Sequence, residues 1–178
     1  AEIYTKAPKV RLYLNDKLIA ERDVNIDTQY KAVIKLPYQP GTLKAVSVDA
    51  NGKEMAESTL RTSSEPATIR LTPDRKLINA DGQDLAFIMV DVVDNDGNIV
   101  ADADIPVTVS VKGRATLLAA ASANLKDLEP KTSPKVTTYK GKAIIVVRSG
   151  RKAGKAVISA SMPKENGSKS TSLTITCK

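Results

Sequence analysis

Apolar and polar residues alternate along most of this chain, a pattern typical of strands that bury one face. Two stretches, residues 46–56 and 90–101, repeat one another: an alternating run stops at a short cluster of Asp, Asn and Gly, and a second run follows. A run, a turn cluster and a returning run predict a β-hairpin. Apolar residues do not recur with a helical period, so we expect no helix longer than one turn.

The predicted strands follow one another at a spacing of about 8 to 12 residues, as in immunoglobulin-like sandwiches. Five come before residue 66, at residues 10–14, 18–24, 30–36, 42–48 and 55–61. Eight follow, at residues 67–71, 85–93, 105–111, 115–118, 136–139, 142–148, 155–161 and 170–176. The unbroken apolar centre of residues 85–93 predicts a strand that is buried on both faces for part of its length.

The fold class we predict is all-β, with two tandem immunoglobulin-like antiparallel β-sandwich domains. A length of 178 residues suits two sandwich-sized units of about 70 to 110 residues each. Residues 62–66 are short, polar and end in proline, which makes them the best linker candidate. We therefore expect one domain over residues 1–66 and a second over residues 67–178.

Composition argues against several function classes. Aromatic residues make up 3% of the chain and Trp is absent, which counts against sugar-binding modules and against stacking platforms for nucleic acid. Histidine is also absent, so the commonest general base and the commonest zinc ligand are missing. The single cysteine, Cys177, has no partner for an internal disulfide.

The net charge of +7 comes mainly from the last third of the chain, since residues 125–178 carry 12 basic and 3 acidic side chains. These basic residues are spread over predicted turns and strands, which favours a solvated sandwich surface; a docking face for a neighbouring domain is the alternative. We expect no nucleic-acid partner. A run of about 18 apolar residues and a charged, then apolar leader are both missing, so neither a membrane span nor a signal peptide is expected in this chain.

The cluster at residues 94–98, Asp-Asn-Asp-Gly-Asn, invites comparison with calcium loops, because hard cations prefer clustered oxygens. It does not fit the EF-hand register: Gly97 is at the fourth position instead of the sixth, and Ile105 is at position twelve. A type I′ or related hairpin turn is favoured, since Asp, Asn and Gly tolerate a positive φ.

The remaining candidates also favour structural roles. Two carboxylate pairs, Asp102 with Asp104 and Asp127 with Glu129, have the residue type for glycoside hydrolysis, but nothing in the pattern implies a cleft between them. Residues 166–168, Asn-Gly-Ser, match a glycosylation acceptor and are interpreted as a turn. Three aromatic residues are expected to pack in the core or between strands: Tyr38, Phe87 and Tyr139. We predict no catalytic, cofactor-binding or metal-binding residue.

Several segments in each half of the chain match a known family. They are residues 3–7, 10–17, 36–46 and 52–53 in the first half, and residues 65–75, 80–85, 90–98 and 138–142 in the second. On these residues, the first half resembles the immunoglobulin-like domain that follows the catalytic barrel in bacterial glycoside hydrolase family 2 β-galactosidases, and the second half resembles the C-terminal domain of the same enzymes. One departure is the segment 119–124, Ala-Ala-Ala-Ser-Ala-Asn, where many relatives carry an Asn-Gly-Asp loop.

The resemblance implies a non-enzymatic role for this chain within a larger enzyme. In that family the two catalytic glutamates lie in an upstream (β/α)₈ barrel, so no catalytic position carries over to these residues. The implied function is accessory: the two domains support the barrel of the same polypeptide, in a periplasmic or secreted enzyme, with contacts between copies as a further expectation. An adhesin-like or invasin-like bacterial surface module and a carbohydrate-binding module remain the alternatives.

Overall fold

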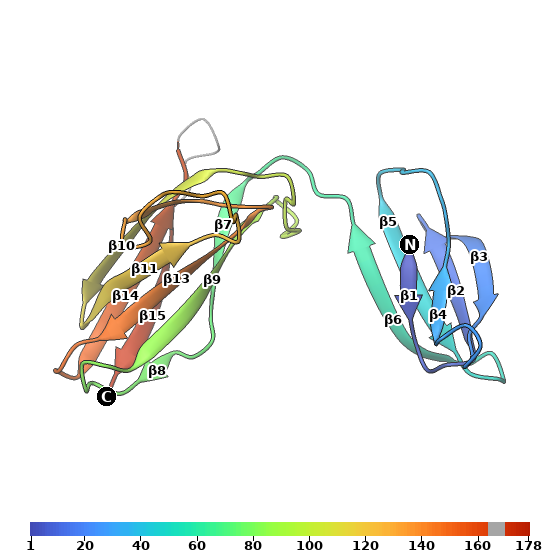
Figure 1. Cartoon of the computed structure of the whole chain (residues 1–178), viewed down its shortest axis with the longest axis horizontal. Coiled ribbons are helices and arrows are strands. Elements are labelled where there is room, and N and C mark those ends of the chain that lie inside the picture. Colours follow the sequence, from blue (N-terminus) through green and yellow to red (C-terminus); the bar gives the residue numbers. More distant parts are fainter. Residues whose placement is uncertain (164–169) are drawn as a thin grey trace. The chain divides into compact units, whose positions relative to one another are not determined.

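The computed structural model describes residues 1–163 and 170–178, and the described residues contain strands and no helix (Figure 1). The predicted all-β sandwich class is confirmed. The chain forms two compact units, Ala1–Thr62 and Ser63–Lys178. The boundary expected after residue 66 falls in the segment that connects the last strand of the first unit to the first strand of the second.

Unit 1, residues 1–62, has a four-stranded and a two-stranded antiparallel sheet. The larger sheet has the order β3-β2-β5-β6 and the smaller one pairs β1 with β4. The strands are β1 Glu2–Tyr4, β2 Lys9–Leu14, β3 Lys17–Asp23, β4 Lys31–Val33, β5 Thr42–Val48 and β6 Glu54–Arg61. The predicted hairpin over residues 10–24 is confirmed as β2 and β3. Its turn residues Asn15 and Asp16 both have a positive φ, as a type I′ turn requires.

The core of unit 1 is small. Val10, Val24 and Ala32 form its buried cluster, with Ile3 packed against them. Val46 and Val48 are buried on the opposite face of the larger sheet, where their cross-strand neighbours are Arg11 and Lys9. Strand β6 is exposed along its whole length.

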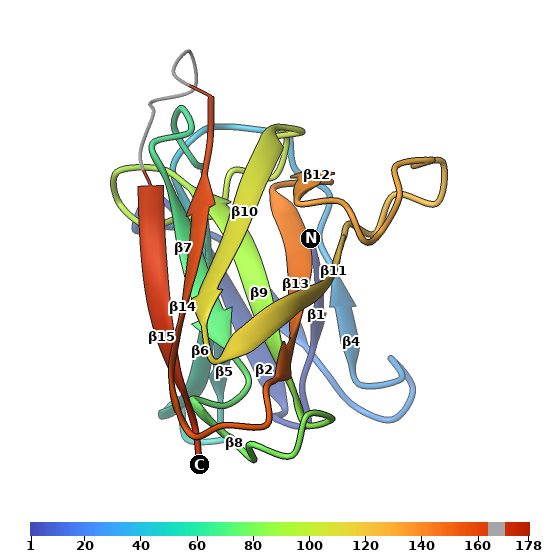
Figure 2. The ribbon, with the colours of Figure 1, turned by 90° about the vertical axis from the view of Figure 1, so that its left-hand side faces the viewer.

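Unit 2, residues 63–178, is a sandwich of a five-stranded and a four-stranded sheet (Figure 2). The strand orders are β12-β10-β14-β15-β8 and β11-β13-β9-β7. The strands are β7 Thr68–Pro73, β8 Leu77–Ile78, β9 Leu85–Val93, β10 Pro106–Gly113, β11 Ala115–Ala121, β12 Lys135–Thr137, β13 Lys142–Ser149, β14 Gly154–Ser161 and β15 Ser170–Cys177. All pairs are antiparallel except β15 with β8, which run parallel over two residues.

The inward positions of both sheets of unit 2 meet in one continuous core of 23 buried residues. Strand β13 shows the alternation well: Ala143, Ile145 and Val147 are buried, while the residues between them are partly exposed. On β9 the second half is buried on both faces, because Val90, Asp91, Val92 and Val93 are all buried. The two-sided burial that the apolar run predicted is therefore confirmed for that half.

Several details differ from the sequence prediction. The strand expected over residues 30–36 is limited to Lys31–Val33, and the alanine-rich residues 119–121 continue strand β11 beyond its expected end. Two short strands, β1 and β8, were not predicted. Each has at most three residues and depends on a partner that is distant in sequence, so the local pattern carries little signal for either.

Candidate functional site

The two echoing sequence stretches form the same turn. Asp49 Oδ1 accepts the backbone N–H groups of Asn51 and Lys53, and Gly52 N donates to the carbonyl of Asp49. In the second stretch, Asp94 Oδ1 accepts the N–H groups two and four residues ahead, and Gly97 N donates to the carbonyl of Asp94. Only the glycine of each turn has a positive φ, 80° at Gly52 and 82° at Gly97. Each is therefore a type I turn followed by a glycine bulge, related to the expected type I′ turn but distinct from it.

Asp94 makes further contacts that its counterpart in unit 1 does not make. It is buried, with 2% of its surface exposed, and its Oδ2 accepts the N–H of Ser64 at 2.9 Å and the side-chain amide of Asn98 at 3.1 Å. The Ser64 N–H, and then the groups of Asn98 and Asp96, lower the pKa of Asp94 to about 2. The carboxylate thus accepts four hydrogen bonds from the protein, and its role is to fix the turn and the start of unit 2.

Two of the four other carboxylates named from sequence, Asp104 and Asp127, accept backbone N–H groups. Asp104 accepts the N–H of Lys140 at 2.9 Å. Asp127 accepts the N–H of Glu129 at 2.9 Å and pairs with Lys131, which lowers the pKa of its carboxyl. Asp102 is exposed in a turn, and the other three also lie outside the strands. The contacts of these four residues hold loops, and a bond between the two carboxylates of either predicted pair is not among them. Residues 166–168 lie outside the described part of the chain.

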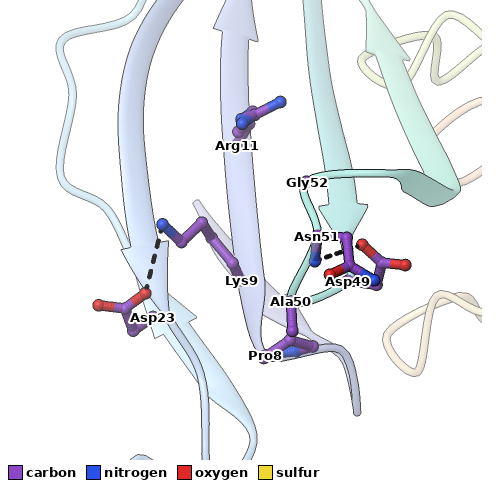
Figure 3. Close-up of a pocket in the computed structure, with 8 residues that line it drawn as sticks. All are labelled: Pro8, Lys9, Arg11, Asp23, Asp49, Ala50, Asn51 and Gly52. Carbon is purple, nitrogen blue, oxygen red and sulfur yellow. Dashed lines mark hydrogen bonds and ion pairs between the residues drawn. The ribbon is translucent and has the colours of Figure 1, made fainter.

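Unit 1 has a shallow hollow of about 430 Å³ beside the Asp49 turn (Figure 3). Its lining comes from the start of β2, the end of β3 and the β5–β6 turn, and consists of Pro8, Lys9, Arg11, Asp23, Asp49, Ala50, Asn51 and Gly52. Figure 3 shows Lys9 directed towards Asp23, at 3.8 Å.

The charges around this hollow are already paired. Glu21 binds Lys9 Nζ at 2.9 Å and Arg11 Nε at 2.7 Å, and these two cations lower the pKa of the Glu21 carboxyl. Oδ1 of Asp49 holds the turn. The described lining therefore lacks the arrangement of a nucleophile next to a base that covalent catalysis requires.

Over residues 1–163 and 170–178, three or more His, Cys, Asp or Glu side chains do not come together in a way that could hold a metal ion. The residues of these two ranges also form no helix long and apolar enough to cross a membrane.

The three aromatic residues that were expected to pack in the core or between strands differ in their outcome. Tyr38 is 80% exposed, so the prediction is wrong for this residue. Phe87 is 41% exposed and lies outside the core, but it pairs with a residue of the neighbouring strand β13, and Tyr139 is partly buried. Phe87 projects from the outer face of the four-stranded sheet of unit 2, next to Met89, which is 40% exposed. The run before Asp91 is apolar on both faces, so the available sequence signal was Asp91 itself, which alternation places on the same face of β9 as Phe87 and Met89.

The chain matches the models of two known domain families. The model of the glycoside hydrolase family 2 C-terminal domain 5 matches residues 69–171, more than half of the chain. The chain belongs to glycoside hydrolase family 2. In unit 1, residues 2–56 match a family described as a domain of unknown function.

The relatives are much longer proteins. The chain is 34% identical to the β-galactosidase BoGH2A of Bacteroides ovatus, over 88% of this chain and 18% of that protein. It is 28% identical to a β-galactosidase of Thermoanaerobacter pseudethanolicus, over 89% of this chain and 21% of that protein. It therefore spans about a fifth of the length of these relatives.

Solved structures of longer proteins are also similar to this chain. A glycosyl hydrolase family 2 member from Bacteroides cellulosilyticus superposes with a TM-score of 0.92 and 32% identity, over 99% of this chain and 22% of that one. A β-glycosidase from Bacteroides vulgatus superposes with a TM-score of 0.89 at 21% identity, and this likeness shows the fold alone.

Proposed function

We propose that this chain is the non-catalytic C-terminal accessory region of a secreted bacterial β-galactosidase of family 2. In this proposal the two units support the catalytic barrel of the same polypeptide. The proposal includes a periplasmic or secreted location and contacts between copies of the enzyme.

The supporting observation is the way the chain overlaps its relatives. Relatives named β-galactosidase match nearly nine tenths of this chain but about a fifth of their own length. A (β/α)₈ barrel needs about 250 residues by itself, more than this chain has. The polar clusters of the described residues agree with an accessory role, because their carboxylates are bonded to backbone N–H groups and to neighbouring cations.

The test uses the longer polypeptide that carries this chain together with a family 2 barrel. Deleting residues 1–178 is expected to lower the temperature at which the enzyme loses activity on a chromogenic galactoside, because the barrel loses a packed neighbour. The 178-residue chain alone is expected to leave the same substrate intact.

Two results would contradict the proposal. Turnover by the 178-residue chain alone, with a rate proportional to its concentration, would show that it is catalytic. An enzyme lacking residues 1–178 with unchanged thermal inactivation would show that these residues give the barrel no support.

A further inference from the structure

The outer face of the four-stranded sheet of unit 2 is apolar at its centre. Cross-strand pairing places its side chains in two rows across β11, β13 and β9. One row runs Ala119, Val146, Phe87, and the other runs Ala121, Ile144, Met89. All six are partly or largely exposed, and we call them the apolar face.

The other outer face of the same sandwich shows what a solvated sheet looks like in this protein. Outward positions of β10, β14 and β15 carry mainly serine, threonine and lysine, among them Thr108, Ser110, Ser159, Ser172 and Thr174. Among the described outward positions of these three strands, Val157 is the only Val, Leu, Ile, Met or Phe. An antiparallel sheet that faces water alternates apolar inside with polar outside, and the apolar face breaks this rule. Contiguous apolar surface of this kind marks an interaction site.

Charged side chains border the apolar face at both ends of its strands. At one end Asp91 is held between Arg70 and Lys142, at 3.0 Å and 2.8 Å. At the other end Arg148 pairs across the strands with Leu85 and is exposed.

Beside Phe87, Asp74 accepts the Phe87 N–H at 2.9 Å and pairs with Arg75 at 3.2 Å. Asp84 lies 3.5 Å from Arg75. The border therefore carries charges of both signs, in nearly equal number.

The length of the relatives indicates what covers this face. The β-galactosidases that match this chain are about five times as long, so about four fifths of such a polypeptide lies outside residues 1–178. A neighbouring domain of that polypeptide is held close to the face by the chain itself, whereas a second copy must associate from solution. A surface with aliphatic or aromatic side chains at its centre and charged groups of both signs around them matches both the face and its border.

We propose that the apolar face is the docking surface for another domain of the longer family 2 polypeptide, one that offers an apolar centre with a rim of acidic and basic side chains. The inference rests on the proposed function for the existence of that domain. It adds which sheet makes the contact and what chemistry lies opposite.

Methionine oxidation tests this directly, because Met89 lies in the apolar face while Met162 is buried inside unit 2. Dilute hydrogen peroxide is applied to the 178-residue chain and to the longer polypeptide, with free methionine added to calibrate the dose, and the sulfoxide at each site is measured by peptide mass spectrometry. We expect Met89 to react at least several-fold more slowly in the longer polypeptide and Met162 to react slowly in both. Equal rates at Met89 in the two samples would overturn the proposal. Protection of Met89 in the 178-residue chain that grows with its concentration would assign the face to a second copy instead and overturn it too.

A matched pair of variants gives an independent test. Phe87 and Val157 have nearly equal exposure, 41% and 40%, on the two opposite outer faces. In the longer polypeptide, Phe87→Lys is expected to lower the thermal inactivation temperature and to restore Met89 oxidation, while Val157→Lys changes neither. In the 178-residue chain the two variants are expected to unfold at similar temperatures. Equal behaviour of the two variants in the longer polypeptide would overturn the proposal.

These outcomes separate the inference from the proposed function. If deletion of residues 1–178 destabilises the enzyme but Met89 is unprotected, the accessory role stands and the docking face is wrong. If deletion has no effect while Met89 is protected, the face is occupied but the supporting role is wrong.

Discussion

The two units differ greatly in the number of side chains in their buried clusters. Unit 2 buries 23 side chains between two sheets, whereas the buried cluster of unit 1 has three, under a sheet of only two short strands. Both nevertheless use the same turn, in which an aspartate accepts the N–H groups two and four residues ahead. Local turn chemistry is therefore sufficient to shape a hairpin, but the stability of a sandwich depends on how much apolar surface its two sheets enclose.

This comparison leads us to expect two unfolding transitions in urea, with unit 1 unfolding first. The chain offers a separate probe for each, because four of its five tyrosines, Tyr4, Tyr13, Tyr30 and Tyr38, are in unit 1. Tyrosine fluorescence should follow mainly the first transition, and far-ultraviolet circular dichroism should follow both. Coincident transitions by the two probes would contradict the comparison.

The largest effect is expected for Ile145→Ala, in the centre of strand β13 of unit 2, where the side chain is fully buried. Removing these buried carbons leaves a cavity in a close-packed core and should cost about 3 kcal/mol of unfolding free energy. The second transition should move to lower urea in circular dichroism, with the tyrosine transition unchanged. A shift of the tyrosine transition as well would mean that the two units unfold as one.

A smaller effect is expected for Val10→Ala, which removes two methyl groups from the buried cluster of unit 1. The cost should be about 2 kcal/mol. Because unit 1 buries far fewer apolar residues than unit 2, we expect this change to move the tyrosine transition to lower urea and to leave the second transition in place. A tyrosine transition that did not move would show that the cluster contributes little to unit 1.

Acid should weaken unit 2 through Asp94. The folded state holds the pKa of this carboxyl at about 2, below its ordinary value of 3.8. The ionised group therefore stabilises the fold fully above pH 4, and this contribution is lost as the pH falls towards 2. The urea midpoint of the second transition, measured from pH 5 to pH 2, should fall less steeply in Asp94→Asn than in the parent chain. Gly97→Ala is the control, since it alters the same turn and keeps the carboxylate, and it should retain the parent's pH dependence.

The smallest effects are expected for Gly52→Ala and Gly97→Ala. A Cβ at either position would meet no atom within 4 Å, so the cost comes only from placing alanine at a positive φ. Each change should cost about 1 kcal/mol, in the first transition for Gly52 and in the second for Gly97. A clear difference between the two costs would show that the surrounding unit, and not the turn alone, sets the strain.

Sequence alone predicted most of the strands because their signals are local. The alternation over residues 42–48 and the run over residues 85–93 define strands β5 and β9 with the bounds that the structure has. It also indicated that Asp94 serves a turn, since the spacing of Asp, Asn and Gly matches what a hairpin needs. The prediction that the chain contains no catalytic residue remains a prediction. A local pattern of strands and turns does not show which side chains distant in sequence come together.

Tertiary structure alone decided the rest. The parallel pairing of β8 with β15 joins residues about a hundred positions apart, and the exposure of Phe87 and Met89 depends on which face of β9 the second sheet covers. Asp91 lies on the same face of β9 as Phe87 and Met89, but the run before it is apolar on both faces, and either face of that run could be buried at a similar free energy. The order of residues thus determined strands, turns and family, and the packing of two sheets determined which apolar residues stay exposed.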